Sequence, residues 1–325
     1  MIRMQWIALF FALVTMAATA PTQAQSWPVK SVRFVVPFAP GGLQDVLARL
    51  VADKLRPRLG QPVIVENKPG AGGDVGAKLV ANSPADGYTV LVASDPGFTT
   101  APALSKDPGF DPVRDFAPIT GVMRVSFLLA VHPSVPVNTL PEFVGYAKAR
   151  PGQLNFASTG VGMPHTLAME LLKQTAGVNL VPVLYKGGAM AAQDLIAGRV
   201  QAMFGTWVIF GPYVQSGRLK AIGVSSAARS AKAPDVRSIA EQGYPGFEVW
   251  SWTGLLAPAG TPPVAIARLT EETQAVLASP EIKERIFALG LDSVPIISPA
   301  AFGEQIKVDV AKWAKLIRDA NIKPE

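Results

Sequence analysis

Apolar residues after position 30 alternate between short continuous runs and stripes with helical spacing. Continuous runs bounded by Pro, Gly or Asn are typical of buried strands, and an i, i+3, i+4 spacing is typical of helices. Leu47, Leu50, Val51 and Leu55 form such a stripe. In the first part of the chain, strands are expected at 31–38, 62–67 and 88–94, and helices at 45–59 and 73–83. This order predicts a largely parallel sheet with helices on both faces.

The same alternation starts again near residue 125, and the C-terminal part is helical. Strands are expected at 125–133, 154–158, 180–185, 200–204 and 219–226, and helices at 140–152, 164–177, 191–199, 262–279, 281–290 and 301–321. In the last helix, residues with helical spacing are interpreted as a core-facing stripe: Phe302, Ile306, Val310, Trp313 and Ile317. We therefore predict two α/β lobes, each a mostly parallel sheet flanked by helices. Lobe 1 combines residues 25–124 and 248–325, and lobe 2 spans residues 125–247.

The N-terminus has the pattern of a secretory signal peptide over residues 1–24. Arg3 supplies an early positive charge, an apolar run extends from about Trp6 to Ala18, and small residues precede the expected cleavage after Ala24. A membrane anchor is the alternative, although the run is shorter than the roughly 20 residues that span a bilayer. Cleavage places the mature chain outside the inner membrane.

Composition removes several classes of function. The absence of cysteine excludes a lipid-attachment Cys, disulfides, Cys–Zn sites and thiol catalysis. The net charge of +6 comes from scattered basic residues, so no concentrated patch indicates nucleic-acid binding. His132 and His165 are the only histidines, and neither has a partner at metal-ligand spacing. We expect no metal and no cofactor.

The segment FAPGGLQD, residues 38–45, joins the first strand to the first helix. Pro40 stiffens this loop, and Gly41 and Gly42 permit a ligand to approach the backbone. Asp45 stands where a helix N-cap is expected. The loop is either a plain capped turn or an anion site formed by N–H groups at the positive end of the helix.

A second loop of this kind lies in lobe 2. Ser158, Thr159, Gly160 and Gly162 follow a short strand and precede a helix. In open α/β sheets, ligands bind outside the carboxyl ends of the strands, where both loops are expected. Facing one another across a cleft, the loops could grip the two ends of one small anion. Because neither contains Lys or Arg, neutral donors would hold the carboxylate.

Other motifs are weaker. The run from Gly70 to Val75 fails the dinucleotide fingerprint, since valine stands where its last glycine is required. Ser158 and His165 could be a nucleophile and a base, but no G-x-S-x-G elbow surrounds the serine. A secreted hydrolase stays an alternative on that ground. Tyr185 in YKGG could close over a ligand.

The succession of motifs over the whole mature chain resembles the solute-binding receptors of tripartite tricarboxylate transporters, the Bug family. The segments that carry this resemblance include FVVPFAPGGLQD, ENKPGAGGDVGAKL, ARPGQLNFASTGVGMPH, LYKGGAMAAQDLIAGRVQAMF and LLAPAGTPP. The resemblance implies a non-enzymatic periplasmic binding protein of type II, the Venus flytrap architecture. It also implies delivery of a small carboxylate to membrane subunits of the transporter. The family's ligand loops correspond here to Phe38, Pro40, Gly41, Gly42, Asp45, Ser158, Thr159, Gly160, Gly162 and His165.

The chain departs from the family pattern at three places in the expected site. These are Leu43 and Gln44 in the first loop, Met163 in the second, and Gly205, Thr206 and Trp207 after VQAMF, where the family usually has Asp. The substitutions make the cleft more apolar and remove a partner for a ligand ammonium. We therefore expect an aromatic or otherwise apolar carboxylate rather than an acidic amino acid, bound by a monomer. A receptor that presents its ligand to a membrane sensor is the alternative.

Overall fold

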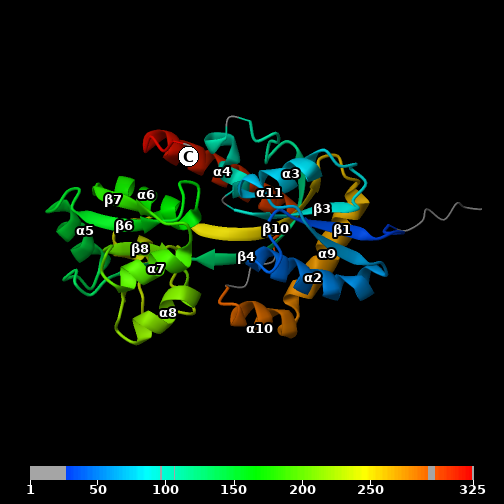
Figure 1. The fold of residues 1–325 in the computed structure, drawn as a ribbon. Helices are drawn as coiled ribbons and strands as arrows, with labels where there is room; N and C mark the ends of the chain where they lie inside the picture. The colour runs from blue at the N-terminus through cyan, green and yellow to red at the C-terminus, as the bar shows by residue number, and fades with distance from the viewer. Residues whose placement is uncertain (1–26, 96, 106, 292–296, 324–325) are drawn as a thin grey trace, which may run out of the picture.

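The computed structural model describes residues 27–95, 97–105, 107–291 and 297–323. Within them, two five-stranded sheets form the centres of two lobes that lie side by side, each flanked by helices (Figure 1). This confirms the predicted two-lobed α/β fold class. The expected signal peptide, residues 1–24, lies outside the described residues. In the part that the structure describes, no helix is both long and apolar enough to span a bilayer.

The sheet of lobe 1 has the strand order β2-β1-β3-β10-β4. Its strands are β1 (Val32–Val36), β2 (Val63–Asn67), β3 (Thr89–Ser94), β4 (Phe116–Ser126) and β10 (Trp250–Pro258). β1 pairs in parallel with β2 and β3, whereas β10 is antiparallel to β3 and β4. Its helices are α2 (Leu43–Leu59), α3 (Asp74–Ala81), α4 (Gly97–Leu104), α9 (Pro263–Ala278), α10 (Pro280–Ala288) and α11 (Pro299–Asp319), with the short turn η1 (Ala71–Gly73).

The sheet of lobe 2 repeats this design with the order β7-β6-β8-β5-β9. Its strands are β5 (Leu128–Val131), β6 (Leu154–Ser158), β7 (Leu180–Leu184), β8 (Ala202–Gly205) and β9 (Lys220–Val224). Its helices are α5 (Leu140–Lys148), α6 (Pro164–Ala176), α7 (Gly188–Ile196) and α8 (Trp207–Gln215), followed by the turn η2 (Ala240–Gln242). Each sheet is mixed, with parallel β-α-β pairs on one side and antiparallel pairs on the other, so the expectation of mostly parallel sheets is wrong. The antiparallel pairs arise where extended chain, not a crossover helix, passes between the lobes.

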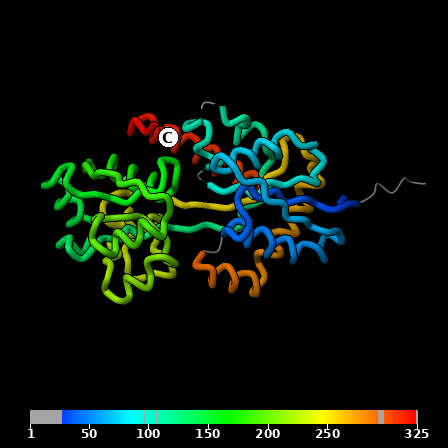
Figure 2. Tube along the Cα trace, viewed as in Figure 1, coloured from blue at the N-terminus to red at the C-terminus, as the bar shows by residue number. Residues whose placement is uncertain are grey.

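The lobes are joined at a narrow crossing that residues of three segments hold together. The expected strand at 125–133 divides at Phe127, because β4 ends in lobe 1 and β5 begins in lobe 2. The Phe127 N–H donates to Ser225 Oγ at 2.8 Å, and the Ser225 N–H donates to the Phe127 carbonyl at 2.8 Å. Ser225 Oγ in turn donates to the Val249 carbonyl at 2.7 Å, just before β10. Figure 2 shows β4 and β10 running between the lobes as neighbouring segments.

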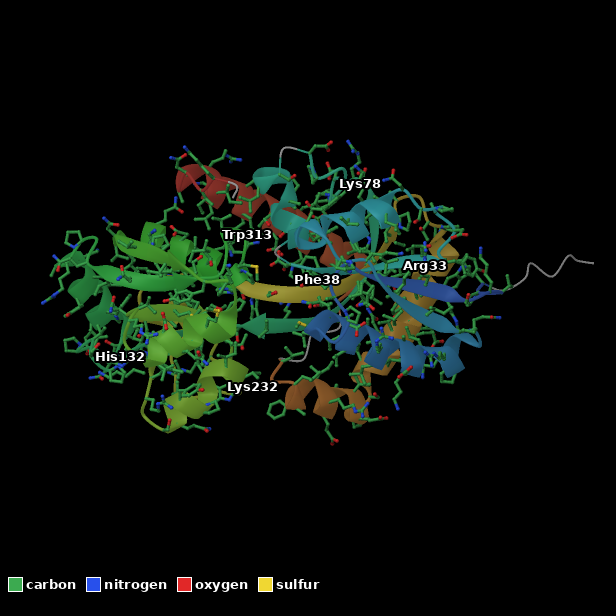
Figure 3. All side chains as sticks on the ribbon, viewed as in Figure 1. Arg33, Phe38, Lys78, His132, Lys232 and Trp313 are labelled. Carbon is green, nitrogen blue, oxygen red and sulfur yellow. The ribbon has the colours of Figure 1, made fainter. Side chains whose placement is uncertain are left out.

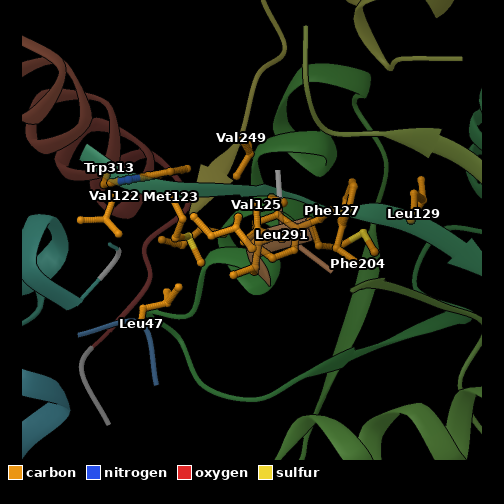
Figure 4. Close-up of a cluster of buried hydrophobic side chains, with 14 of the residues drawn as sticks. Leu47, Val122, Met123, Val125, Phe127, Leu129, Phe204, Val249, Leu291 and Trp313 are labelled. Atoms are coloured by element: carbon orange, nitrogen blue, oxygen red, sulfur yellow. The ribbon is translucent and has the colours of Figure 1, made fainter. Parts of the chain in front are cut away.

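Buried apolar side chains continue through this crossing (Figure 4). Leu47, Met123, Val125, Phe127 and Phe204 belong to one cluster that extends from lobe 1 into lobe 2. The stripe on α11 is also core: four of its five members are at most 4% exposed, namely Phe302, Ile306, Trp313 and Ile317. Full burial of such side chains stabilises the fold by about 1.5–3 kcal/mol each, so α11 is fixed to lobe 1.

Strand β10 has no counterpart among the expected strands, and the apolar pattern also did not reveal two helices, α4 and α8. Each contains a proline, Pro102 or Pro212, which removes a helical hydrogen bond and is a normal signal for a helix end. Both helices follow a strand directly, and tertiary packing holds them there. Their positions matter for the site, because α4 forms part of its wall.

Candidate functional site

A cavity of about 580 Å³ lies between the two lobes at the carboxyl ends of their strands. Lobe 1 contributes the loop after β1, the turn before α3, the end of β3 and helix α4, and lobe 2 contributes the loop between β6 and α6. The labelled Phe38 lies near the middle of the molecule, on the side of lobe 1 that faces lobe 2 (Figure 3). Of the residues expected in the site, six line this cavity: Phe38, Gln44, Thr159, Gly160, Gly162 and Met163.

The first loop is organised by the buried carboxylate of Asp45. Its Oδ2 accepts the N–H of Gly41 at 2.9 Å, and its Oδ1 accepts bonds from Arg49 Nη2 and Asn67 Nδ2, each at 2.9 Å. The Arg49 guanidinium, helped by the Gly41 N–H and the Asn67 amide and opposed by burial, lowers the pKa of Asp45 to about 2. The carboxylate is therefore fully engaged in holding the loop.

The predicted N-cap role of Asp45 is wrong. Helix α2 begins two residues earlier, at Leu43, and Gly42 occupies the N-cap with extended backbone. Gly41 has φ +80°, a left-handed conformation that glycine adopts without strain. The helix can start early because Asp45 reaches back over its own first turn to the Gly41 N–H.

Several expected members of the first loop do not face the cavity. Pro40, Gly41 and Gly42 are exposed outside its lining, and Asp45 is buried behind it. Leu43 packs against the core cluster instead, since the first residue of α2 is turned toward the sheet. Gln44 does reach the cavity, where its Nε2 donates to Ser94 Oγ at 3.1 Å.

The second loop is fixed by two internal side-chain pairs. Ser158 Oγ lies 3.0 Å from Thr166 Oγ1, and Thr159 Oγ1 lies 2.6 Å from His165 Nε2. Desolvation lowers the pKa of His165 to about 4, so its imidazole is neutral at physiological pH. Ser158 is 4% exposed and is bonded to Thr166, not to His165. The serine and histidine considered as nucleophile and base are therefore not paired, and neither lines the cavity.

The lobes come very close at Gly162. A Cβ at this glycine would stand 2.8 Å from Leu104 Cδ1 of α4, across the cavity. Met163, next in the chain, is 42% exposed although it lines the same space. The second loop and α4 thus form a contact whose spacing requires the glycine.

The remaining predicted residues of lobe 2 lie outside the cavity lining. The Tyr185 hydroxyl donates to Asp194 Oδ2 at 2.8 Å, and burial together with this carboxylate raises the pKa of Tyr185 to about 12. Gly205 and Thr206 lead into α8, and the Trp207 ring packs one turn along on Gly211, where a Cβ would lie 2.8 Å from Cε2. Local packing in lobe 2 therefore holds the residues that had been expected to select the ligand.

Conversely, the cavity has lining residues that sequence reasoning missed. They include Asp74, Ser94, Asp95, Thr100 and Ser251. Ser94 and Asp95 stand at the carboxyl end of β3, so the rule that located the two glycine loops could have found them. Asp74 and Ser251 had no comparable signal.

Asp95 also connects the cavity to a buried polar cluster against α11. Its Oδ1 accepts the Thr99 hydroxyl, and burial, reinforced by the nearby Asp309 carboxyl, holds the pKa of Asp95 well above its usual range. Asp309 accepts Trp252 Nε1 at 2.9 Å on one oxygen and Gln305 Nε2 at 3.0 Å on the other. Trp252 is 3% exposed and packs in the core.

No group of three or more His, Asp or Glu side chains in the described ranges is arranged to hold a metal ion. His132 lies on the outer side of lobe 2, far from Phe38 (Figure 3), with its Nδ1 2.8 Å from Ser134 Oγ. The lining of the cavity thus offers hydroxyl, amide, backbone and carboxyl groups to a ligand.

Two α/β lobes joined by extended strands, with a cavity at the facing strand ends, define a solute-binding protein. The family model described as "Tripartite tricarboxylate transporter family receptor" matches residues 47–322. The chain therefore belongs to this family of solute-binding receptors, as the resemblance indicated.

Individual relatives agree with this assignment. Protein BugT of Bordetella pertussis is 35% identical over 320 residues, which cover 98% of this chain and 97% of that protein. The periplasmic binding protein BugD is 37% identical in its solved structure, covers 92% of this chain and all of its own, and superposes with a TM-score of 0.72. An R. palustris protein solved with adipate is 33% identical, with the same coverage and a TM-score of 0.75.

Proposed function

We propose that this protein is a periplasmic receptor that captures a small organic carboxylate between its lobes and delivers it to a tripartite tricarboxylate-type membrane transporter. The observation that carries the proposal is the 580 Å³ cavity lined by both lobes. A ligand in this space contacts both lobes at once, so its binding favours the closed arrangement over the open one. Export with cleavage after Ala24, and action as a monomer without catalysis, belong to the same proposal.

The carboxylate is proposed to bind at the lobe 2 loop through neutral donors. Thr159, Gly160 and Gly162 belong to the lining, whose described residues include no Lys or Arg. Oriented N–H and O–H groups can hold an anion without a full counter-charge. Phe38, Leu104, Val161 and Met163 supply apolar lining, which supports the expectation of an aromatic or otherwise apolar ligand.

The proposed lobes are residues 25–124 with 248–325, and residues 125–247. The crossing of the chain at Phe127 and its return through Ser225 and Val249 support this division. Closure is then a rotation of one lobe against the other at these three segments, which brings the Gly162 loop toward α4.

Native mass spectrometry of the purified protein, followed by calorimetry with an acid panel that includes adipate and phenylacetate, tests the proposal. Substitution Gly162→Val places side-chain atoms against Leu104 and should weaken binding at least tenfold without unfolding the protein. Leu104→Ala in the same chain should restore most of the affinity, because it removes the atom that lies 2.8 Å away. Gly145→Ala, where a Cβ has open space, is the matched control.

Absence of binding to every acid, with no small acid retained on purification, would refute the receptor assignment. Unchanged affinity in Gly162→Val would leave the receptor standing but would remove the site from this cavity.

A further inference from the structure

The ionisable side chains in the described lining of the cavity are all acidic. Asp74 and Asp95 line it, and the described lining residues include no Lys, Arg or His. A ligand with two carboxylates would bring one of them close to the Asp74 carboxylate in this partly desolvated space, and two like charges close together are unfavourable. The described lining is therefore unfavourable for a dianion, although one relative of this chain is solved with the dicarboxylate adipate.

Asp74 is a carboxylate without a partner among the described residues. It is the first residue of α3, and its side chain makes no hydrogen bond or ion pair there. Burial raises the pKa of Asp74, and no neighbouring cation offsets that effect. Lys78, one turn along α3, is directed toward Gly109, where a Cβ would lie 2.7 Å from its Nζ. Figure 3 shows Lys78 on the outer side of lobe 1, away from Phe38.

The contrast with Asp45 shows what is unusual about Asp74. Asp45, also in the first turn of a helix, is satisfied by Arg49, Asn67 and Gly41. A half-buried carboxylate left without a donor is costly unless something else supplies one. Because Asp74 lines the interlobe cavity, the ligand is in a position to supply that donor.

The surroundings of Asp74 limit what such a ligand can be. The Phe38 ring stands beside the turn before α3, since a Cβ on Gly73 would lie 3.5 Å from its Cζ. Asp95, which also lines the cavity, is 2% exposed, and its Oδ2 has no hydrogen-bond partner among the described residues. The lobe 2 side offers neutral donors and the apolar side chains of Val161 and Met163.

We infer that the cavity takes a zwitterion: one carboxylate on the Thr159–Gly162 loop of lobe 2, one ammonium on Asp74 of lobe 1, and an apolar body between them. This inference rests on the proposed receptor function and specifies its ligand class. It agrees with the expectation that the ligand is not an acidic amino acid. It also gives each lobe one charged end of the ligand, so that neither lobe alone binds it well and closure depends on both charges.

Two matched series of probes test the inference by calorimetry at pH 7.5. The first contains 5-aminopentanoate, pentanoate and adipate, and the second contains phenylalanine, 3-phenylpropionate and benzylmalonate. Within a series, the ammonium is replaced by hydrogen or by a second carboxylate. In at least one series the ammonium form should bind about tenfold or more tightly than the plain acid, the range of a hydrogen bond to a charged group. The dicarboxylate should bind most weakly.

Asp74→Asn should abolish the advantage of the ammonium form while changing the affinity for the plain acid less than about threefold. Asp74→Glu, which keeps the charge, should retain part of the preference. Asp235→Asn, an exposed acid in lobe 2, is the control and should behave as wild type. Circular dichroism checks that each variant is folded. If Asp74→Asn does not fold, Asp74→Ser is used in its place.

The outcomes separate the inference from the function on which it rests. If in both series wild type binds the dicarboxylate at least as tightly as its ammonium counterpart, the zwitterion inference is wrong and the carboxylate receptor remains. The same holds if the neutral variant at position 74 keeps the full preference. If wild type binds none of these probes and no other acid, both proposals are wrong.

Discussion

Replacing Asp45 with Asn isolates the contribution of one carboxylate to the architecture of the first loop. The variant keeps the shape of the side chain but loses the charge that pairs with Arg49 at 2.9 Å. The amide nitrogen also cannot accept the Gly41 N–H that Oδ2 accepts at 2.9 Å. We therefore expect a less stable loop and lobe with no change in overall fold.

The magnitude follows from the lowered pKa. A fall in the pKa of Asp45 from 3.8 to about 2 corresponds to about 2.5 kcal/mol of stabilisation when the group is charged. Arg49 is 50% exposed, so water screens part of this interaction. We expect Asp45→Asn to lower the free energy of unfolding by about 1–2 kcal/mol at pH 7.

The loss of stability caused by Asp45→Asn should depend on pH. A carboxyl whose pKa is depressed in the folded state stabilises that state above its ordinary pKa near 3.8 and ceases to do so as pH falls through about 2. The difference between wild type and variant should therefore shrink between pH 5 and pH 2. Denaturant titrations at pH 7, 5, 4, 3 and 2.5 measure it.

A matched control lies on the same helix. Asp53 is 60% exposed and pairs with Arg56 at 3.2 Å, so Asp53→Asn should cost less than about 0.5 kcal/mol at any pH. If Asp45→Asn lowers the free energy of unfolding no more than Asp53→Asn does, Asp45 does not organise the loop as described. The same conclusion follows if the loss in Asp45→Asn is equal at pH 2.5 and pH 7.

Two further predictions concern buried groups. Burial lowers the pKa of His165 to about 4, so as pH falls below 6.5 the unfolded chain binds a proton before the folded one does, and the free energy of unfolding of wild type should fall by up to about 3 kcal/mol by pH 4. His165→Gln should lack this loss in denaturant titrations. An imidazole pKa near 6.5 by NMR would contradict the prediction. Trp313 is 1% exposed in the core, so Trp313→Ala should lower the free energy of unfolding by about 3–5 kcal/mol. The control Val264→Ala, at a 64% exposed position on α9, should leave a thermal melt nearly unchanged. Equal effects of the two substitutions would show that α11 does not anchor the lobe.

The sequence predicted this fold well because both lobes are built from local patterns. Each expected strand or helix overlaps an observed one, and the expected strand at 125–133 divides at Phe127 between β4 and β5. A periodicity of apolar residues cannot report that division, since Val125 and Leu129 are buried in one continuous cluster that passes through both lobes. Helices α4 and α8 escaped prediction because their prolines are local signals against a helix, and packing in the folded protein outweighs them.

Both loops that were expected to hold the ligand contribute to the interlobe cavity, but only some of their residues line it. Phe38, Gln44 and Thr159 face the cavity as expected, whereas Leu43 and Trp207 pack into their own lobes. Which way a loop residue points depends on the helix start that follows it. That start was set at Leu43 by the contact between Asp45 and Gly41, not by the sequence pattern around Asp45.

By itself, then, the sequence determined the alternation of strands and helices, the two glycine-containing loops at strand ends, and membership of a receptor family, since each is carried by residues close together in the chain. Only the tertiary structure decided that Asp74 and Asp95 share a cavity with Thr159 and Gly162. The reason is physical. These residues are brought together by the packing of two lobes through one crossing. Whether the charge of a side chain can act on a ligand depends on its burial and on its hydrogen-bond partners, which the sequence does not give.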